Sequence, residues 1–297
     1  MKVLVLGATG MLGCTLVPLL QAHGHQVVSQ SRSNLSGFVA TDLTNIDETS
    51  RLLGGSSADA VINLTGLTDV ERCESHPQEA WLANVRIAEN IAAASSAAGA
   101  HLIHISTDQV YDKAPIASEE DAMPGNHYAM TKYAGELAAL AVPATVLRTN
   151  FFGASAHPTR RSLTDWLFNA LHKGSAVQVF EDVRFSPLSM ATLCEMIEQV
   201  VQRRPLGIFN LGSHAGLSKA DFAFVFAAEL GLSSGHLNRS TTDQAGFLKA
   251  WRPKEMCMDS SRFEAEFNLV LPRLQDEIQR VTKDYRELIK KPDADQR

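Results

Sequence analysis

Tyr128 and Lys132 are the residues whose types and spacing point most directly to chemistry. They lie four positions apart, and on a helix this spacing places both side chains on one face. A phenol has an ordinary pKa of about 10, and a neighbouring ammonium favours the phenolate. We therefore expect Lys132 to lower the pKa of Tyr128 and to make the phenol a general acid. The spacing alone is common by chance, so the interpretation depends on the residues that surround the pair.

A hydroxyl pair, Ser106 and Thr107, ends the apolar segment that begins at His101 and precedes Asp108. Ligands of open parallel sheets bind beyond the carboxyl ends of the strands. Either hydroxyl can then donate a hydrogen bond to a substrate carbonyl. The same Ser-Thr-Asp sequence also suits a helix N-cap or a turn, and this alternative stays open. We interpret His104, in the same segment, as a core histidine rather than a catalyst.

Three glycines, Gly7, Gly10 and Gly13, directly follow an apolar segment and open a helical pattern. Glycine permits a tight turn and lets backbone N–H groups approach a pyrophosphate, which the helix N-terminus also favours. A strand before the loop and a helix after it make such a match more specific than the bare spacing. The sequence therefore predicts a dinucleotide-binding loop, in which we include Thr9, Met11 and Leu12.

The segment Ser29–Ser33 bears on which dinucleotide is bound. An NAD site usually carries an acid here to bind the ribose hydroxyls, but the chain has no Asp or Glu before Asp42. Arg32, beside Ser31, can instead hold a 2′-phosphate; the alternative is a solvated loop arginine. We expect NADPH as the cofactor, with NADH possible. Asp42 is expected to reach the adenine amino group, and Leu43 to pack beside the ring.

Short apolar segments alternate with helical patterns through the first two-thirds of the chain, which is typical of a parallel sheet covered on both faces. We predict an α/β fold: a doubly wound parallel Rossmann sheet with a smaller, mostly C-terminal α/β substrate domain. Residues 1–150 form the dinucleotide-binding domain, completed by parts of 175–205, and residues 151–174 and 206–297 form the substrate-binding region. The predicted strands of the sheet are Lys2–Leu6, Gln26–Gln30, Ala60–Leu64, His101–Ser106 and Ala144–Arg148. The predicted helices between them are Met11–His23, Pro77–Ala98 and Tyr128–Ala139.

The composition excludes several classes of partner. The 297 residues carry a formal net charge of -6 and no basic stripe, so we expect neither a nucleic-acid nor a membrane partner. The four scattered cysteines fit a reducing compartment and give no support for a metal. No segment approaches the roughly 18 apolar residues of a membrane span. We expect a cytoplasmic protein, either a monomer or a homodimer.

Together the motifs resemble the extended short-chain dehydrogenase/reductase superfamily and, within it, the dTDP-4-dehydrorhamnose reductase family. The resemblance runs along nearly the whole chain. The segments that carry it, besides the glycine loop and Ser106-Thr107-Asp108, are Asn63–Thr65, Glu71–Glu74, Leu82–Asn84, Tyr128–Glu136, Leu147–Thr149, Arg252-Pro253, Asp259–Phe263 and Phe267–Pro272.

The resemblance implies roles for individual residues. Tyr128 would be the proton donor, Lys132 would bind the nicotinamide ribose, Thr107 beside Ser106 would orient the substrate, and Asn84 would support the lysine. Further cofactor contacts would come from Leu64, Thr65, Gly66 and Thr149, and further substrate contacts from Asp108, Phe151 and Arg252. Two positions depart from the family: Gln109 replaces a tyrosine, and Phe151 stands where a tryptophan is usual. These departures bear on the identity of the sugar. For Phe151 the alternative of a core aromatic stays open.

The implied reaction is the NADPH-dependent reduction of the 4-keto group of a nucleotide-linked 6-deoxy sugar, as in the conversion of dTDP-4-dehydrorhamnose to dTDP-L-rhamnose. Two alternatives remain open. One is an epimerase or reductase that acts on a different nucleotide-sugar. The other is a non-catalytic protein that resembles the regulatory subunit of methionine adenosyltransferase.

Overall fold

A seven-stranded sheet organises the N-terminal part of the protein. The computed structural model describes residues 1–290. Every pairing in the sheet is parallel, and the strand order is β11-β6-β5-β4-β1-β2-β3. The strands are β1 (Lys2–Leu6), β2 (Gln26–Ser31), β3 (Val39–Ala40), β4 (Ala60–Asn63), β5 (His101–Ile105), β6 (Ala144–Thr149) and β11 (Gly207–Leu211). The order reverses direction between β1 and β4, as in a Rossmann sheet.

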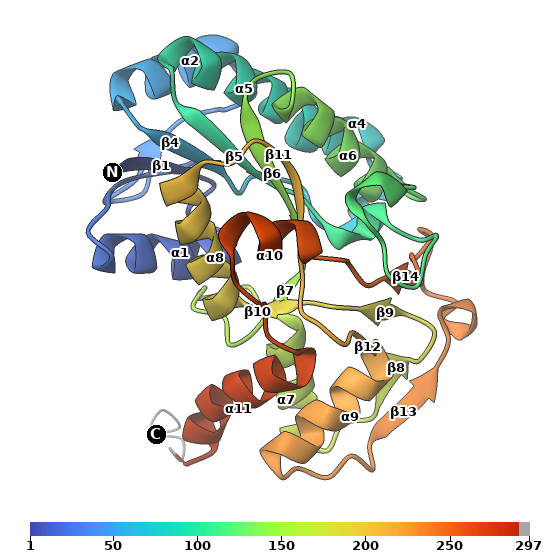
Figure 1. Ribbon diagram of the computed structural model, residues 1–297. Helices are drawn as coiled ribbons and strands as arrows, with labels where there is room; N and C mark the ends of the chain where they lie inside the picture. Colours follow the sequence, from blue (N-terminus) through green and yellow to red (C-terminus); the bar gives the residue numbers. More distant parts are fainter. Residues whose placement is uncertain (291–297) are drawn as a thin grey trace.

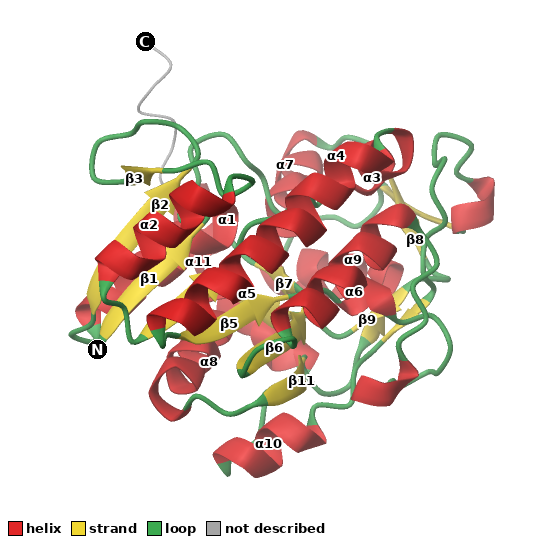
Figure 2. Ribbon diagram, turned by 90° about the horizontal axis from the view of Figure 1, so that it is seen from above, coloured by secondary structure: helices red, strands yellow, loops and turns green. Residues whose placement is uncertain are grey.

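Helices cover both faces of this sheet (Figure 1). On one face lie α1 (Met11–Ala22) and α8 (Met190–Arg203), whose leucines and valines share one apolar core with the strands. On the other face α2 (Ile46–Ser56), α5 (Ile87–Ala98) and α6 (His127–Ala139) lie side by side (Figure 2). Strands buried on both faces explain the nearly continuous apolar segments of the sequence. The predicted doubly wound α/β fold is confirmed.

The C-terminal half does not separate cleanly from the sheet. Strand β11 lies within the range predicted for the substrate-binding region, yet it pairs with β6 at the edge of the Rossmann sheet. Helix α10 (Ser261–Phe267) buries Phe263 and Phe267 in the same core as α1 and α8. Helix α8 falls within 175–205, the range expected to complete the first domain. The two units are therefore interleaved in sequence, and the boundary at residue 206 differs from the structure.

The smaller unit packs around a second core rich in aromatic side chains. Phe152, Phe222, Phe226 and Tyr285 meet there at ring-centroid distances of 4.9 to 6.3 Å. Its helices are α7 (Leu163–Lys173), α9 (Lys219–Leu230) and α11 (Leu274–Lys290). Its strands are β7 (Phe151–Phe152), β8 (Val177–Phe180), β9 (Arg184–Phe185), β10 (Leu188–Ser189), β12 (Leu217–Ser218), β13 (Leu237–Ser240) and β14 (Glu255–Met256). The smaller unit lies below the carboxyl ends of the large sheet in Figure 1.

Some elements depart from the sequence predictions. Helix α2, capped by Asn45, and the short helix α3 (Val70–Ser75) were not predicted. The single helix predicted over Pro77–Ala98 is instead α4 (Pro77–Trp81), a π-helical turn over Leu82–Arg86, and α5.

Among residues 1–290, no helix combines the length and apolar character needed to cross a bilayer. Residues 291–297 of the predicted C-terminal region lie outside the described part of the chain.

Candidate active site

A cavity of about 290 Å³ opens beyond the carboxyl ends of β1, β4, β5 and β6. Most of the residues predicted to act on cofactor or substrate lie in its wall, although they come from five separate segments of the chain. The wall contains Gly10, Met11, Leu12, Gly13, Leu64, Thr65, Gly66, Ser106, Thr107, Asp108, Tyr128, Lys132, Thr149 and Phe151. The parallel topology explains the convergence, because each of these segments follows a strand that ends at the same edge of the sheet.

Each of the three loop glycines has a steric reason to lack a side chain. Gly7 has a φ of +73°, and a Cβ there would lie 3.1 Å from the Thr65 methyl group. A Cβ on Gly13 would lie 2.3 Å from the Ala8 carbonyl oxygen, so α1 could not begin so close to β1. The Gly10 N–H donates to the Gly7 carbonyl at 2.9 Å and closes the turn. The loop is thus a tight turn that ends at the N-terminus of α1, where backbone N–H groups suit a phosphate group.

Tyr128 and Lys132 lie on the inner face of α6, with both side chains almost completely buried. Asn126 caps this helix, since its Oδ1 accepts a hydrogen bond from the Ala129 N–H at 2.8 Å. The Lys132 Nζ donates to the Ile105 carbonyl oxygen at 2.7 Å, which fixes α6 against the end of β5. The spacing of four residues therefore places the phenol and the ammonium at one edge of the cavity, as the sequence predicts.

The predicted lowering of the Tyr128 pKa by Lys132 is wrong for this site. Burial raises the pKa of Tyr128 above its ordinary range, and hydrogen bonding with Thr107 opposes the rise only in part. The nearby Asp108 carboxyl raises the Tyr128 pKa further. Burial also lowers the pKa of Lys132 to about 8, with Glu136 acting in the opposite direction. The phenol consequently keeps its proton at neutral pH, which is the form that a proton donor requires.

Thr107 and Ser106 have different surroundings, although they are adjacent. The Thr107 Oγ1 accepts from the Gln109 N–H at 3.2 Å and caps the short 3-10 helix Asp108–Val110, so the N-cap alternative is correct and compatible with a place in the cavity wall. The Ser106 hydroxyl donates to a Glu136 carboxylate oxygen. Its hydrogen is thus directed away from the cavity, and Thr107 is the better placed of the two to orient a substrate.

The acceptor of the Ser106 hydrogen belongs to a buried ion pair. Arg148 on β6 contacts Glu136 on α6 at 2.6 Å, and both side chains are at most 1% exposed. Arg148 also donates to the Tyr111 hydroxyl oxygen at 2.7 Å, so its hydrogen-bonding groups remain satisfied. An ion pair this deeply buried costs desolvation and tolerates the loss of neither partner. It fixes α6 and the Ser106-Thr107 turn to the sheet.

Asn84 supports the lysine region through the π-helical turn Leu82–Arg86. Its side chain accepts from the Leu67 N–H at 2.8 Å and donates to the Thr131 hydroxyl at 3.0 Å. It does not appear in the cavity wall. A single extra residue in a helical turn is a frequent feature of functional sites. The structure gives Asn84 a positioning role between the loop after β4 and α6.

Asp108 lies in the cavity wall with only 1% of its surface exposed. Burial raises the pKa of this carboxyl to about 6, although hydrogen bonds and the charge of Lys219 oppose the rise. Asn150 donates to its Oδ2 at 2.7 Å. Asp108 therefore titrates close to neutrality within the cavity.

The predicted adenine-side residues lie outside the cavity wall. Arg32 and Asp42 are exposed, whereas Ser31 is buried. Hydrogen bonds from Thr44 lower the pKa of Asp42, with a smaller contribution from Arg32. Leu43 is buried in the core beneath α2 and α5 rather than presented to a ring. Gly7 and Thr9 shape the loop without lining the cavity.

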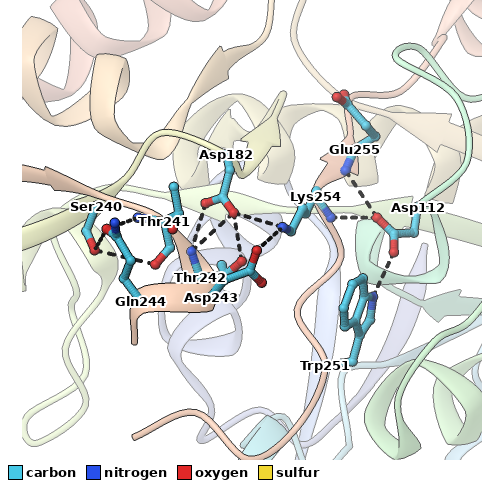
Figure 3. Close-up of polar contacts among 10 residues, drawn as sticks. All are labelled: Asp112, Asp182, Ser240, Thr241, Thr242, Asp243, Gln244, Trp251, Lys254 and Glu255. Atoms are coloured by element: carbon cyan, nitrogen blue, oxygen red, sulfur yellow. Dashed lines mark hydrogen bonds and ion pairs between the residues drawn. The ribbon is translucent and has the colours of Figure 1, made fainter. Parts of the chain in front are cut away.

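Arg252 also lies outside the cavity wall. Its Nη2 contacts a Glu71 carboxylate oxygen at 2.6 Å, so the predicted substrate contact is here an ion pair between the two units. The surrounding segment is fixed at further points (Figure 3). Asp112 accepts from the Trp251 Nε1 at 2.7 Å, and Asp182 contacts the Lys254 Nζ at 3.1 Å. The segment between β13 and β14 thus connects the smaller unit to the Rossmann unit.

Five residues in the cavity wall were not among the predicted site residues: Thr68, Ile105, Gln109, Asn150 and Arg160. Gln109 was noted only as a departure from the family. Arg160 lies in the loop before α7, and it forms no ion pair with an acid of residues 1–290. Nothing in the local sequence marks this arginine, because only the fold brings it into the same cavity wall as Gly10–Gly13.

His104 is buried in β5, as expected for a core histidine. Its Nδ1 lies 3.0 Å from the Asn63 amide nitrogen, whereas its Nε2 has no partner among residues 1–290. Burial lowers its pKa well below the ordinary value. The histidine is therefore neutral, and it is not part of the cavity wall.

Known proteins resemble the chain over most of its length. A probable low-salt glycan biosynthesis reductase, Agl14, from Haloferax volcanii is 28% identical, covering 94% of this chain and 96% of that protein. A dTDP-4-dehydrorhamnose reductase from Streptomyces griseus is 28% identical, over 88% of this chain and 86% of that protein. The β subunit of methionine adenosyltransferase 2 from Rattus norvegicus is also 28% identical, over 89% of this chain and 81% of that protein.

A solved structure shares the fold. The dTDP-4-dehydrorhamnose reductase of Bacillus anthracis, in complex with NADP, superposes with a TM-score of 0.87 at 23% identity. The superposition covers 95% of this chain and 99% of that chain. A family model described as the RmlD substrate binding domain matches residues 1–287. The chain therefore belongs to the RmlD substrate-binding domain family.

Proposed function

We propose that this protein is an NADPH-dependent reductase of the 4-keto group of a nucleotide-linked 6-deoxy sugar, with dTDP-4-dehydrorhamnose as the first substrate to test. One observation carries the proposal. The Tyr128 phenol, the Lys132 ammonium and the Thr107 hydroxyl lie in one cavity wall with the glycine loop Gly10–Gly13. The Streptomyces griseus relative, a dTDP-4-dehydrorhamnose reductase, supports the choice of sugar.

The residues at the loop fit a dinucleotide. Gly7, Gly10 and Gly13 permit the tight turn, because a Cβ at each would crowd Thr65, the Gly7 carbonyl or the Ala8 carbonyl, and the turn ends at a helix N-terminus. Arg160 adds a positive charge to the wall of the same cavity. The absence of an acid at the end of β2, with Arg32 there instead, favours NADPH over NADH. The Bacillus anthracis structure, a complex with NADP, is consistent with this preference.

NADPH, when bound at this site, would supply the hydride for the carbonyl carbon. Tyr128 donates its phenolic proton to the oxygen, where negative charge develops, and recovers a proton from solvent afterwards. Thr107 holds the carbonyl oxygen near the phenol. The positive charge of Lys132 stabilises the phenolate that remains after transfer. General acid catalysis of this kind typically contributes about 10²–10⁴-fold.

The Tyr128 and Lys132 pair can serve hydride transfer in either direction, and the two relatives described as reductases favour reduction over the alternative of an epimerase. The cavity also argues against a non-catalytic role like that of a regulatory subunit, because Tyr128, Lys132 and Thr107 are all present.

The direct test is NADPH oxidation, followed at 340 nm, with a panel of dTDP-, GDP-, CDP- and UDP-linked 4-keto sugars. We expect one NADPH to be consumed per dTDP-4-dehydrorhamnose, with NADH used less efficiently. An epimerised product without net NADPH consumption would support the epimerase. Absence of turnover with every sugar, together with binding to a methionine adenosyltransferase catalytic subunit, would replace the proposal with the regulatory alternative.

A further inference from the structure

One buried carboxyl group joins two strand ends in the cavity wall. The Asp108 Oδ1 accepts a hydrogen bond from the Thr107 Oγ1 at 3.3 Å, and its Oδ2 accepts one from the Asn150 Nδ2 at 2.7 Å. Thr107 follows the end of β5, Asn150 follows β6, and all three residues line the cavity. Because only 1% of Asp108 is exposed, we expect the carboxyl to affect a ligand through these two neighbours rather than by direct contact.

The Thr107 hydroxyl has a single hydrogen, and Asp108 determines where that hydrogen points. The hydroxyl donates to the Asp108 Oδ1 and accepts from the Gln109 N–H. Tyr128 also forms a hydrogen bond with Thr107, which opposes the rise in the pKa of the phenol. An ionised carboxylate can only accept hydrogen bonds. An ionised Asp108 therefore keeps the Thr107 hydrogen, and the phenolic hydrogen of Tyr128 is then directed at Thr107.

A proton on Asp108 reverses the direction of this hydrogen bond. The protonated carboxyl has one O–H donor, which can donate to the Thr107 Oγ1 and release the Thr107 hydrogen toward the cavity. A substrate carbonyl oxygen only accepts hydrogen bonds, so it then has Thr107 as a second donor beside Tyr128. We propose that Asp108 is a positioning residue that, in its protonated form, directs the Thr107 hydrogen to the carbonyl oxygen of the substrate. This inference rests on the proposed function, in which Thr107 holds that oxygen.

The titratable groups that face Asp108 come from three further parts of the fold. Lys219, the first residue of α9, has a positive charge that opposes the rise in the pKa of Asp108. Burial raises the pKa of Tyr128 on α6, and it raises the pKa of Cys257, which follows β14, to about 11. Both groups are therefore neutral near pH 6. Because desolvation of Asp108 outweighs the charge of Lys219, its pKa is about 6, and the carboxyl changes its protonation state between about pH 5 and pH 7.

The test is the pH dependence of kcat/KM for dTDP-4-dehydrorhamnose between about pH 5 and pH 7. NADPH is kept saturating, so that titration of its 2′-phosphate does not enter the profile. The loss of one hydrogen bond predicts that the wild-type kcat/KM falls by about three- to tenfold as the pH rises through about 6.

Two substitutions separate the direction of the hydrogen bond from the charge of the carboxyl. Asp108→Asn can donate to Thr107 through its Nδ2 and accept from Asn150 through its Oδ1, as the protonated carboxyl does. This variant should keep the wild-type pH 5 value across the whole range. Thr107→Val removes the hydroxyl, so its kcat/KM should be independent of pH here and no higher than the wild-type value at pH 7. Thr107→Ser keeps a hydroxyl and should restore the pH dependence.

Asp182→Asn is the matched control. Asp182 also accepts a hydrogen bond from a threonine hydroxyl, that of Thr242 at 2.8 Å, and lies beside a lysine, but it is outside the cavity wall (Figure 3). This variant should keep the wild-type pH dependence.

The outcomes distinguish the inference from the proposed function. The inference is overturned if an active wild type shows no fall through pH 6, or if Thr107→Val shows the fall. It is also overturned if Asp108→Asn keeps the fall or stays at the wild-type pH 7 value. In each of these cases the wild type still reduces the sugar, so the proposed function stands. If the wild type consumes no NADPH with the sugar, the proposed function fails and the inference falls with it.

Discussion

The Lys132 ammonium donates a 2.7 Å hydrogen bond to the Ile105 carbonyl oxygen, the last backbone acceptor of β5 before the Ser106-Thr107 turn. One contact thus joins the helix that carries Tyr128 to the strand that presents Thr107. Because Lys132 and Ile105 are both buried, their contact is shielded from water. The charge on Lys132 has no exposed counter-ion to screen it. The protonation state of this lysine should therefore govern the site.

Reductase activity should decline as the pH rises through about 8. Burial lowers the pKa of Lys132 to about 8, so the ammonium loses its proton in this range and no longer stabilises a Tyr128 phenolate. We expect kcat/KM for NADPH-dependent reduction to fall about tenfold per pH unit above that pKa. A pH–rate profile of Lys132→Arg provides the control. Its decline should move to higher pH whatever its absolute rate, and an unmoved decline would assign the titration to another group.

Gly135 should not tolerate a methyl group. A Cβ at this position would lie 2.3 Å from the Asn84 carbonyl oxygen, in the contact between α6 and the π-helical turn. Gly135→Ala should lower the free energy of unfolding by about 1–3 kcal/mol. Gly54, within α2, has open space around its Cβ position, so Gly54→Ala should stabilise the protein by about 0.4–1 kcal/mol. Urea denaturation compares the two. Equal effects would show that the close approach at Asn84 is not what requires glycine.

Much of the fold was predictable because it follows from local patterns. Strand β1 has the predicted bounds, and β2, β4, β5 and β6 differ from their predicted bounds by one residue at the C-terminal end, since apolar runs mark these strands. Helix α2 was missed, although Asn45 caps it with two hydrogen bonds to backbone N–H groups. Two consecutive glycines and a nearly neutral mean hydropathy hide its apolar face, which consists of little more than Leu53.

The site was predictable in its residue types but not in its electrostatics. The spacing of Tyr128 and Lys132 correctly indicates a shared helix face. The sign of the Tyr128 pKa shift was wrong because burial, which no local spacing reveals, outweighs the charge of the lysine. Arg160 was missed for a related reason. It lies almost 150 residues from the glycine loop in sequence, and tertiary structure alone places it in the same wall.

Asp108 should make stability depend on pH in an unusual direction. Its folded-state pKa is raised to about 6, above the ordinary value of 3.8. Between these values the native protein binds a proton that the unfolded chain has released, so stability falls as the pH rises through this window. Asp108→Asn removes the effect. The free energy of unfolding of this variant, minus that of the wild type, should therefore increase by at most about 3 kcal/mol between pH 4 and pH 7.

A carboxyl with the opposite shift provides the control for Asp108. Hydrogen bonds from Thr44 lower the pKa of Asp42, so its ionised form stabilises the native state above the unfolded pKa. Asp42→Asn should therefore have a lower free energy of unfolding than the wild type at pH 7. The difference between the two proteins should be smaller at pH 3. Denaturation curves at both pH values separate the two variants. The same pH trend in both would contradict the burial of the Asp108 charge.

Arg160 should bind a diphosphate. It lines the same cavity as Gly10–Gly13 and forms no ion pair with an acid within residues 1–290. We expect Arg160→Gln to weaken NADP+ binding by about ten- to 150-fold, as measured by calorimetry, while 2′,5′-ADP, which lacks the pyrophosphate bridge, binds with little change. Charge-assisted hydrogen bonds of this kind contribute about 1.5–3 kcal/mol.

The adjacent Arg161 is exposed and does not line the cavity, so Arg161→Gln is the matched control. It should leave NADP+ affinity within about twofold of the wild type. If Arg160→Gln instead weakens only dTDP binding, the arginine serves the substrate diphosphate rather than the cofactor. Equal, small effects of both substitutions on every ligand would remove Arg160 from the site.

The central claim is that Tyr128 supplies the proton, and a single substitution tests it most directly. Tyr128→Phe keeps the ring in its buried position and removes only the hydroxyl. We expect NADPH oxidation with dTDP-4-dehydrorhamnose to fall by about 10²–10⁴-fold, while NADP+ binds with unchanged affinity. Turnover within a few fold of the wild-type rate, with the cofactor still bound, would contradict the assignment of Tyr128 as the acid.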